Sequence, residues 1–246
     1  MSGIEVGIFL VLLFVVAFLY SSVGHGGASG YLALMALFSI APVTMKTSAL
    51  IMNIFVSLIS FVHYYRGGHF KIKLFLPFAV ASVPASFAGA LVAVDGNLYR
   101  KILGAVLLFP ILRLFGIFGK ESEEVKNVNL VVALVLGASI GFLSGMIGIG
   151  GGIILSPVIL LLHWAKMKET AAVSALFIFV NSISALAGLF TSGIHIDPSV
   201  YVWLGVSLAG GFAGAYVGSR KLKNPILKKV LAFTLLIASI KLLVTK

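Results

Sequence analysis

The sequence predicts an all-α protein that crosses a membrane several times, and three observations support this prediction. Of the 246 residues, 60% are hydrophobic and only 10% are charged, whereas a soluble domain carries about 25% charged residues. Stretches such as 4–20, 74–94 and 128–143 are nearly free of charge, and each approaches the roughly 20 apolar residues that cross a bilayer as a helix. The strict alternation of apolar and polar residues that marks a membrane β-barrel is absent from the sequence.

The first apolar segment is expected to remain in the mature protein as a helix. Its start holds Glu5 and no basic residue, and no A-x-A pattern precedes the first glycine run, so the marks of a cleaved signal peptide are missing. The lack of cysteine excludes disulfides and thiolate metal sites. The net charge of +11 is typical of a membrane protein with Lys and Arg at its cytoplasmic helix ends, and no nucleic-acid partner is expected.

The chain is predicted to be a duplicated unit, with one membrane repeat over residues 1–122 and a second over 123–246, together forming one transmembrane domain. The stretch FLYSSVGHGGASGYLAL begins at Phe18, and the stretch FLSGMIGIGGGIILSPV begins at Phe142. A shift of 124 residues aligns their glycines, and three later blocks align in the same order at shifts of 125 to 128. Chance similarity between apolar helices would not keep four blocks in order, which indicates an internal repeat.

Each repeat is predicted to hold five apolar helical segments. Those of the first repeat are residues 4–22, 27–41, 46–65, 73–94 and 98–117. Those of the second repeat are residues 128–146, 150–164, 169–191, 199–218 and 226–245. The second segment of each repeat is short and begins inside a glycine run, so we expect a broken helix that crosses poorly or returns as a re-entrant half-helix. Either way an odd number of crossings per repeat turns the second repeat upside down, which gives an inverted-topology pair.

The basic residues predict the orientation, because cytoplasmic loops carry the excess of Lys and Arg. On one side of the predicted membrane lie Arg66, Lys71, Lys73, Arg113, Lys120, Lys126, Lys166, Lys168, Arg220, Lys221, Lys223, Lys228 and Lys229. On the other side lie Lys46, Arg100, Lys101, Lys241 and Lys246. The richer side is expected to be cytoplasmic, which leaves both termini outside. We expect a prokaryotic inner or plasma membrane.

The two glycine runs are the predicted substrate site. An unwound backbone survives inside a bilayer only where it lines a cavity or holds a ligand, and the first turn of a helix offers free N–H donors that favour an anion. The alternative is close helix packing, but four glycines between 148 and 152 would weaken a helix by roughly 1 kcal/mol each. Packing seams are instead expected at Ala85, Gly89 and Ala93, and at Gly210, Gly214 and Gly218. The substrate-binding glycines are predicted to be Gly24, Gly26, Gly27, Gly148, Gly150, Gly151 and Gly152.

Polar side chains near these runs complete the predicted site. His25 aligns with Ile149, so the two copies differ there. The imidazole could donate hydrogen bonds to an anion, take up a proton, or remain a neutral ring bonded to a carbonyl. The serines and asparagines within the segments either bind the substrate or join helices by hydrogen bonds. The side-chain candidates are His25, Ser29, Ser48, Asn53, Ser174 and Asn181.

The acidic residues exclude several classes of function. All seven stand at segment ends or in loops, so no carboxylate is expected at mid-membrane depth to coordinate a cation or to carry a proton. A cation pump is therefore not expected. A membrane hydrolase would need a nucleophile and base or a metal cluster, and no catalytic residue, metal ligand or cofactor is predicted.

The sequence resembles the sulfite exporter TauE/SafE family over essentially its whole length. The resemblance lies in the pattern G-x-G-G-G from Gly148 to Gly152 followed by Pro157, in Thr-Ser-Ala-Leu from Thr47, and in the turn Tyr-Arg-Gly-Gly from Tyr65. The resemblance implies a small membrane transporter of sulfite or of organosulfur anions such as sulfonates.

Three functions are weighed from the sequence. The favoured one is a secondary transporter that moves a small anion, sulfite or an organosulfonate, outwards by alternating access around the two glycine runs. An anion channel with the same loops as its filter is the first alternative. A membrane scaffold that does not transport is the second, and the duplicated helix breaks argue against it. The expected partners are the anion, the lipid bilayer and a second copy of the chain in a homo-oligomer.

Overall fold

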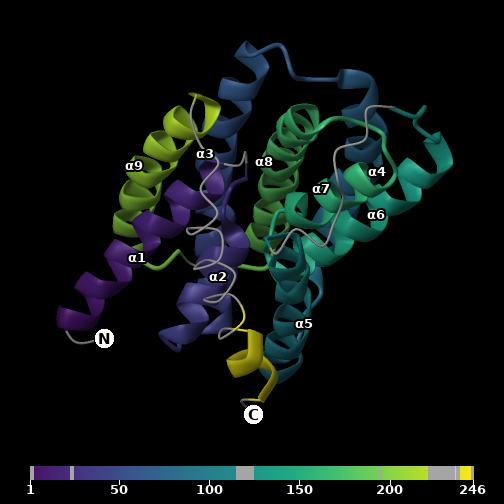
Figure 1. Cartoon of the computed structure of the whole chain (residues 1–246). Coiled ribbons are helices and arrows are strands. Elements are labelled where there is room, and N and C mark those ends of the chain that lie inside the picture. The colour runs from purple at the N-terminus through teal and green to yellow at the C-terminus, as the bar shows by residue number, and fades with distance from the viewer. Residues whose placement is uncertain are drawn as a thin grey trace.

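The computed structural model describes residues 3–22, 25–114, 125–193, 196–220, 236 and 239–244 (Figure 1). Its helices are α1 (Gly3–Ser21), α2 (Ala28–Leu37), α3 (Pro42–Arg66), α4 (Ile72–Leu91), α5 (Gly96–Leu114), α6 (Leu130–Ile147), α7 (Gly152–Leu161), α8 (Met167–Thr191) and α9 (Ser199–Arg220). Residues 239–244 are also helical, and the described residues contain no strand. The rest of the predicted segment 226–245, apart from residue 236, lies outside the described residues.

Six of these helices are long and apolar enough to cross a membrane: α1, α3, α4, α6, α8 and α9. Large apolar side chains are exposed on them, for example Ile4 on α1, Val131 on α6 and Tyr201 on α9. Exposed apolar surface of this extent suits lipid rather than water. These spans confirm the predicted all-α membrane protein at the level of its helices.

The helices break at both glycine runs, as predicted. The helix α1 ends at Ser21 and α2 begins at Ala28, while α6 ends at Ile147 and α7 begins at Gly152. The helices α2 and α7 have 10 residues each, so each is about 15 Å long, half of the roughly 30 Å hydrocarbon core. Both are shorter than the predicted segments, which ran to residues 41 and 164.

A glycine with a positive φ stands directly before each short helix. Gly27 precedes α2 with φ of 98°, and Gly151 precedes α7 with φ of 76°. This left-handed conformation costs little only for glycine, which explains why the chain turns at these positions. The two residues are equivalent at the shift of 124 residues seen in the sequence.

The short helices also end in the same way. The Ile40 N–H donates to the Met35 carbonyl at 3.0 Å, and the Trp164 N–H donates to the Ile159 carbonyl at 3.1 Å. Such bonds over five residues close a helix end when the residue between them is left-handed. Ser39 has φ of 58° and His163 has φ of 55°. Every member of this pattern has its counterpart 124 residues later.

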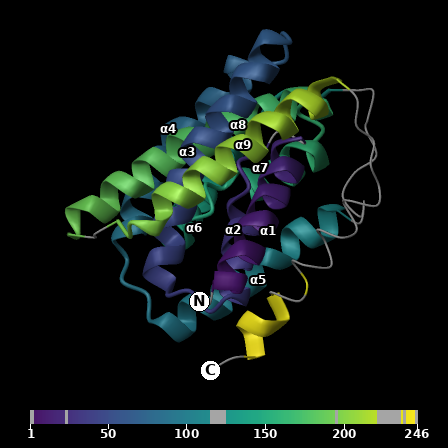
Figure 2. The ribbon, with the colours of Figure 1, turned by 90° about the vertical axis from the view of Figure 1, so that its left-hand side faces the viewer.

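The helices form two groups with matching composition. In the first bundle, α1 packs against α9, α3 also packs against α9, and α2 lies on α1 and α3. In the second bundle, α6 packs against α4, α8 also packs against α4, and α7 lies on α8. Figure 1 shows the α1–α9 pair on the left and the α4–α6 pair on the right, and Figure 2 turns the α1–α9 side towards the viewer. The long helices α3 and α8 meet between the bundles.

Glycines form the seams within each bundle, as the sequence predicts. A Cβ atom at Gly89 of α4 would overlap the Phe142 carbonyl of α6. A Cβ atom at Gly214 of α9 would overlap the Phe18 carbonyl of α1. Only glycine lets these backbones approach so closely, so the packing interpretation is confirmed at both positions.

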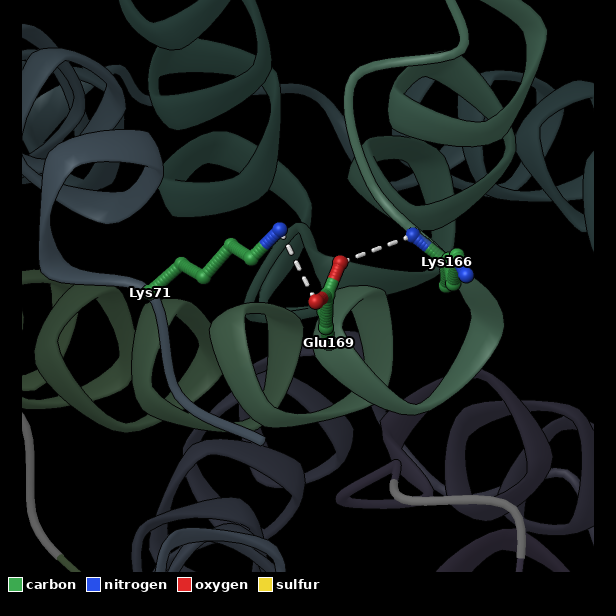
Figure 3. A network of polar contacts seen from close by, with 3 residues as sticks. All are labelled: Lys71, Lys166 and Glu169. Atoms are coloured by element: carbon green, nitrogen blue, oxygen red, sulfur yellow. Dashed lines mark hydrogen bonds and ion pairs between the residues drawn. The ribbon is translucent and has the colours of Figure 1, made fainter. Parts of the chain in front are cut away.

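An ion pair at one end of the second bundle fixes the starts of α4 and α8 side by side (Figure 3). The Lys71 Nζ atom lies 2.8 Å from Glu169 Oε1, and the Lys166 N–H donates to Glu169 Oε2 at 3.0 Å. Lys71 precedes α4 and Lys166 precedes α8. Both lysines belong to the larger group of basic residues in the charge count, so the structure agrees with placing them on one side.

Candidate functional site

The two glycine runs meet at the side chain of Asn53, which is fully buried on α3. The Asn53 Oδ1 atom accepts from the Ala28 N–H at 3.1 Å, and Asn53 Nδ2 donates to the Ile149 carbonyl at 3.3 Å. A Cβ atom at Gly26 would lie 2.6 Å from Oδ1, and one at Gly150 would lie 2.8 Å from Nδ2. One carboxamide therefore links both predicted halves of the site, and neither glycine can carry a side chain.

The helix α8 approaches the same place from the second bundle. A Cβ atom at Gly26 would lie 3.1 Å from Ile178 Cγ2, and one at Gly150 would lie 2.8 Å from that atom and 2.9 Å from Ser182 Oγ. Ile178 and Ser182 are four residues apart and share a face of α8. We call the group Gly26, Asn53, Gly150, Ile178 and Ser182 the central junction.

The ends of two helices with positive partial charge lie at the central junction. The first N–H groups of a helix have no partner within the helix itself, and each N-terminus acts as about half an elementary positive charge. At α2 one of these N–H groups, that of Ala28, is already bonded to the amide oxygen of Asn53.

Several buried polar atoms on α3 and α8 have no hydrogen-bond partner. They include Ser182 Oγ at the junction, Asn181 Oδ1 beside it in sequence, and Ser48 Oγ on α3. Buried polar atoms are nearly always paired in folded proteins. The Ser182 hydroxyl beside Gly150 is therefore an unpaired polar group next to the second glycine run.

His25 joins the first glycine run to the second bundle. The residue is 2% exposed, and His25 Nε2 lies 3.0 Å from Ser156 Oγ on α7. Ser156 Oγ also lies 2.8 Å from the Gly152 carbonyl and 2.7 Å from Ser174 Oγ on α8. The predicted residues His25 and Ser174 are thus connected through Ser156, which the sequence analysis did not single out.

The other predicted residues are more scattered. Ser29 bonds the Tyr20 hydroxyl at 2.7 Å and so ties α2 to α1. The Asn181 Nδ2 atom donates to the Phe177 carbonyl of its own helix at 2.8 Å, so Asn181 does not repeat the role of Asn53. Gly24 lies outside the described residues. Within the described part of the chain, no three His, Asp or Glu side chains are grouped so that they could hold a metal ion.

A cavity beside these elements lies where the two bundles meet, at the end of α4 and α8 opposite the Lys71–Glu169 pair. Its volume is about 280 Å³. Pro42, Val43 and Lys46 of α3 form one wall, and the opposite wall comes from α4, α5, α6 and α8. The lining residues are Pro42, Val43, Lys46, Ala90, Leu91, Val92, Ala93, Val94, Tyr99, Met146, Leu189 and Ser192.

Lys46 is the functional candidate that sequence reasoning missed. The predicted segment began at residue 46, which left this lysine at a helix end, whereas α3 begins at Pro42 and Lys46 is buried at 9% exposure. The sequence did contain a signal for the earlier helix start, because Pro42 precedes Lys46 and proline is favoured at the first helical position. A helix that starts at Pro42 carries Lys46 one turn inside.

Comparison with known proteins identifies a family and several relatives. The model of the sulfite exporter TauE/SafE family matches residues 8–242. The chain is 36% identical to the probable membrane transporter protein y4hK of Sinorhizobium fredii over 237 residues, which cover 95% of this chain and 96% of the relative. It is 27% identical to the probable membrane transporter protein YdhB of Bacillus subtilis over 95% of this chain and 98% of the relative. No solved structure matches the chain. With a family model matched over nearly the whole sequence, the chain belongs to the sulfite exporter TauE/SafE family.

Proposed function

We propose that the protein is a secondary transporter, and not an enzyme, that carries sulfite or a small organosulfonate out of the cell by alternating access around the central junction. The observation that supports this most is the meeting of two glycine-capped helix N-termini, those of α2 and α7, at Asn53. The relatives are named probable membrane transporters, which agrees with transport as the activity.

The charge of the junction suits a monovalent anion. Two helix N-termini act together as about one elementary positive charge, and the described residues place no carboxylate there. The glycines of both runs let an oxyanion approach the main chain. In the structure the Asn53 amide oxygen takes the place that an anion oxygen would take at α2, so substrate binding would displace this side chain.

The two bundles supply the elements for alternating access. Each bundle contains helices of both halves of the chain, since α9 joins α1 to α3 and α4 joins α6 to α8. This reciprocal arrangement, together with the matched starts and ends of α2 and α7, supports an inverted pair of repeats over 1–122 and 123–246. Opening the junction between the bundles would break the bonds from Asn53 to Ile149 and from His25 to Ser156.

The membrane potential provides a driving force for export. An inside-negative potential favours the exit of a monovalent anion by about 2.3 kcal/mol per 100 mV. No mid-membrane carboxylate is needed for such a carrier. The substrate class is taken from the family, and the direction from this electrical argument.

The proposal is tested by flux measurements in vesicles that contain the purified protein. Saturable flux of labelled sulfite or of a sulfonate is expected, and Gly26→Val and Gly150→Val should each abolish it because the new side chain would occupy the position of Asn53. Gly205→Val is the matched control, since nothing lies within 4 Å of a Cβ atom there. Wild-type flux in both junction variants would refute the site. Unitary currents without saturation would indicate the anion channel instead.

A further inference from the structure

The cavity beside Lys46 combines an accessible rim with a buried charged floor. Val43 is exposed at its rim, whereas Lys46 is 9% exposed and Tyr99 is 4% exposed. Lys46 is the one charged residue among the described residues that line the cavity. The opening therefore leads from the surface to a single buried cation.

The Lys46 ammonium is poorly satisfied by the protein. Its Nζ atom donates to the Ala90 carbonyl at 3.3 Å, while an ammonium has three donors. The ion pair found in the described residues involves Lys71 and Glu169 at the other end of α4 and α8, so no described carboxylate compensates Lys46. A buried charge without a counter-ion is costly, and an anion in the cavity would remove that cost.

The cavity is also adjacent to the second glycine run. A Cβ atom at Gly148 would lie 2.8 Å from Lys46 Cγ, and the Tyr99 hydroxyl donates to the Ile147 carbonyl at 2.8 Å. Met146 lines the cavity wall directly before these residues. The floor of the cavity thus lies against the backbone that leads to Gly150 and the central junction.

We propose that this cavity is a second anion site, in which the Lys46 ammonium binds the oxygens of a sulfur oxyanion or sulfonate on its way to or from the central junction. The proposal rests on the proposed function for its substrate class. A cavity of about 280 Å³ holds such an anion with several waters, since one water takes about 30 Å³. The apolar remainder of the wall leaves less water around the ammonium than bulk solvent would, which strengthens its attraction to the anion.

A structural role for Lys46 makes a different prediction. In that case the ammonium only caps the carbonyl end of α4, where Ala90 lies in the last turn, as cations do at helix C-termini. In that role the partial negative charge at the end of α4 would offset the ammonium, so the cavity would show little preference between anionic and cationic molecules. Charge selection at a neighbouring position therefore separates the two roles.

The chain has no cysteine, which permits a direct test by thiol labelling of purified protein. Ser192→Cys places a thiol in the cavity wall, and Thr191→Cys places one at the adjacent exposed residue outside the lining. Each variant is labelled with the anionic 2-sulfonatoethyl and with the cationic trimethylammonioethyl methanethiosulfonate. The ratio of anionic to cationic labelling rates should be at least about fivefold higher at position 192 than at position 191. The electrostatic interaction between two unit charges about 4 Å apart in water already corresponds to about a fivefold change in rate.

Further variants assign this selectivity to the lysine. Lys46→Met combined with Ser192→Cys should reduce the ratio to that of Thr191→Cys, whereas Lys46→Arg should retain it. Methanesulfonate should slow the labelling of Ser192→Cys when Lys46 is present and not when it is replaced. Equal ratios at positions 191 and 192 in otherwise wild-type protein would overturn the proposal, and this readout does not depend on whether Lys46→Met folds.

A flux assay keeps this inference distinct from the proposed function. If the wild-type protein transports the anion and labelling shows no charge selection, the second site is refuted and transport stands. If labelling shows the selection and no flux is found, the anion site stands and the proposed transport is refuted. In active vesicles Lys46→Met should raise the KM by about tenfold or more, with Lys46→Arg close to wild type.

Discussion

Replacing Asn53 with leucine tests whether this side chain holds the central junction together. Leucine has a similar size but no hydrogen-bonding atoms, so the Ala28 N–H and the Ile149 carbonyl both lose their bonds. Each buried polar group left without a partner costs about 1–3 kcal/mol. Asn53→Leu should therefore lower the free energy of unfolding by about 2–6 kcal/mol.

Asn181→Leu is the matched control for this experiment. The Asn181 Nδ2 atom bonds only a carbonyl of its own helix, that of Phe177, and Asn181 Oδ1 has no partner. Removing this side chain leaves no buried group stranded, so the loss should stay below about 1 kcal/mol. Reversible unfolding of both variants in mixed detergent micelles measures the difference. Equal stabilities of the two variants would refute the reasoning that Asn53 bridges the glycine runs.

Two further predictions concern the seams and the loops. Gly89→Ala should lower the free energy of unfolding by about 1–3 kcal/mol because the new methyl group overlaps the Phe142 carbonyl, whereas Gly205→Ala, in open space, should not destabilise; equal unfolding curves would contradict the close seam. Hydrogen bonds from Ser199 hold the pKa of Asp197 below its usual value, so this residue adds stability above its unfolded pKa of about 3.9 that is lost as the pH falls through the lower folded pKa. Ser199→Ala should raise the pKa of Asp197 towards the unfolded value and flatten that acid-side loss, which a titration of unfolding between pH 5 and pH 2 would detect.

The helix breaks could be predicted from the sequence because glycine has a direct local cause. Gly27 and Gly151 adopt left-handed backbone conformations that other residues avoid, and the repeat in the sequence pointed to both at once. The seam at Gly89 was predictable from a different local pattern, since small residues at intervals of four mark close helix contacts.

The choice between Asn53 and Asn181 could not be made from the sequence. Each asparagine stands in a row of polar residues at helical spacing, with Ser57 on α3 and with Ser174 on α8, so the pattern marks both as turned inwards and does not distinguish them. The structure turns Asn53 towards both glycine runs, whereas the backbone carbonyl of Asn181 accepts from Ser86 on α4 and its side chain bonds its own helix. Rotation of a helix about its axis is decided by its neighbours.

The cavity beside Lys46 has a similar explanation. Its walls come from α3, α4, α5, α6 and α8, and no local pattern indicates that these segments meet. The charge count treated Lys46 as one basic residue among many at the segment ends. Its burial becomes visible only when the start of α3 at Pro42 is combined with the packing of α4 above it.

A structure of the protein with selenite, a heavier analogue of sulfite, tests the central claim most directly. Anomalous scattering from selenium would locate the anion without relying on its shape. The account predicts a peak between the N-termini of α2 and α7, within hydrogen-bond distance of the first amides that follow Gly27 and Gly151. Bound selenite elsewhere, with none at the central junction and unchanged bonds of Asn53, would contradict it.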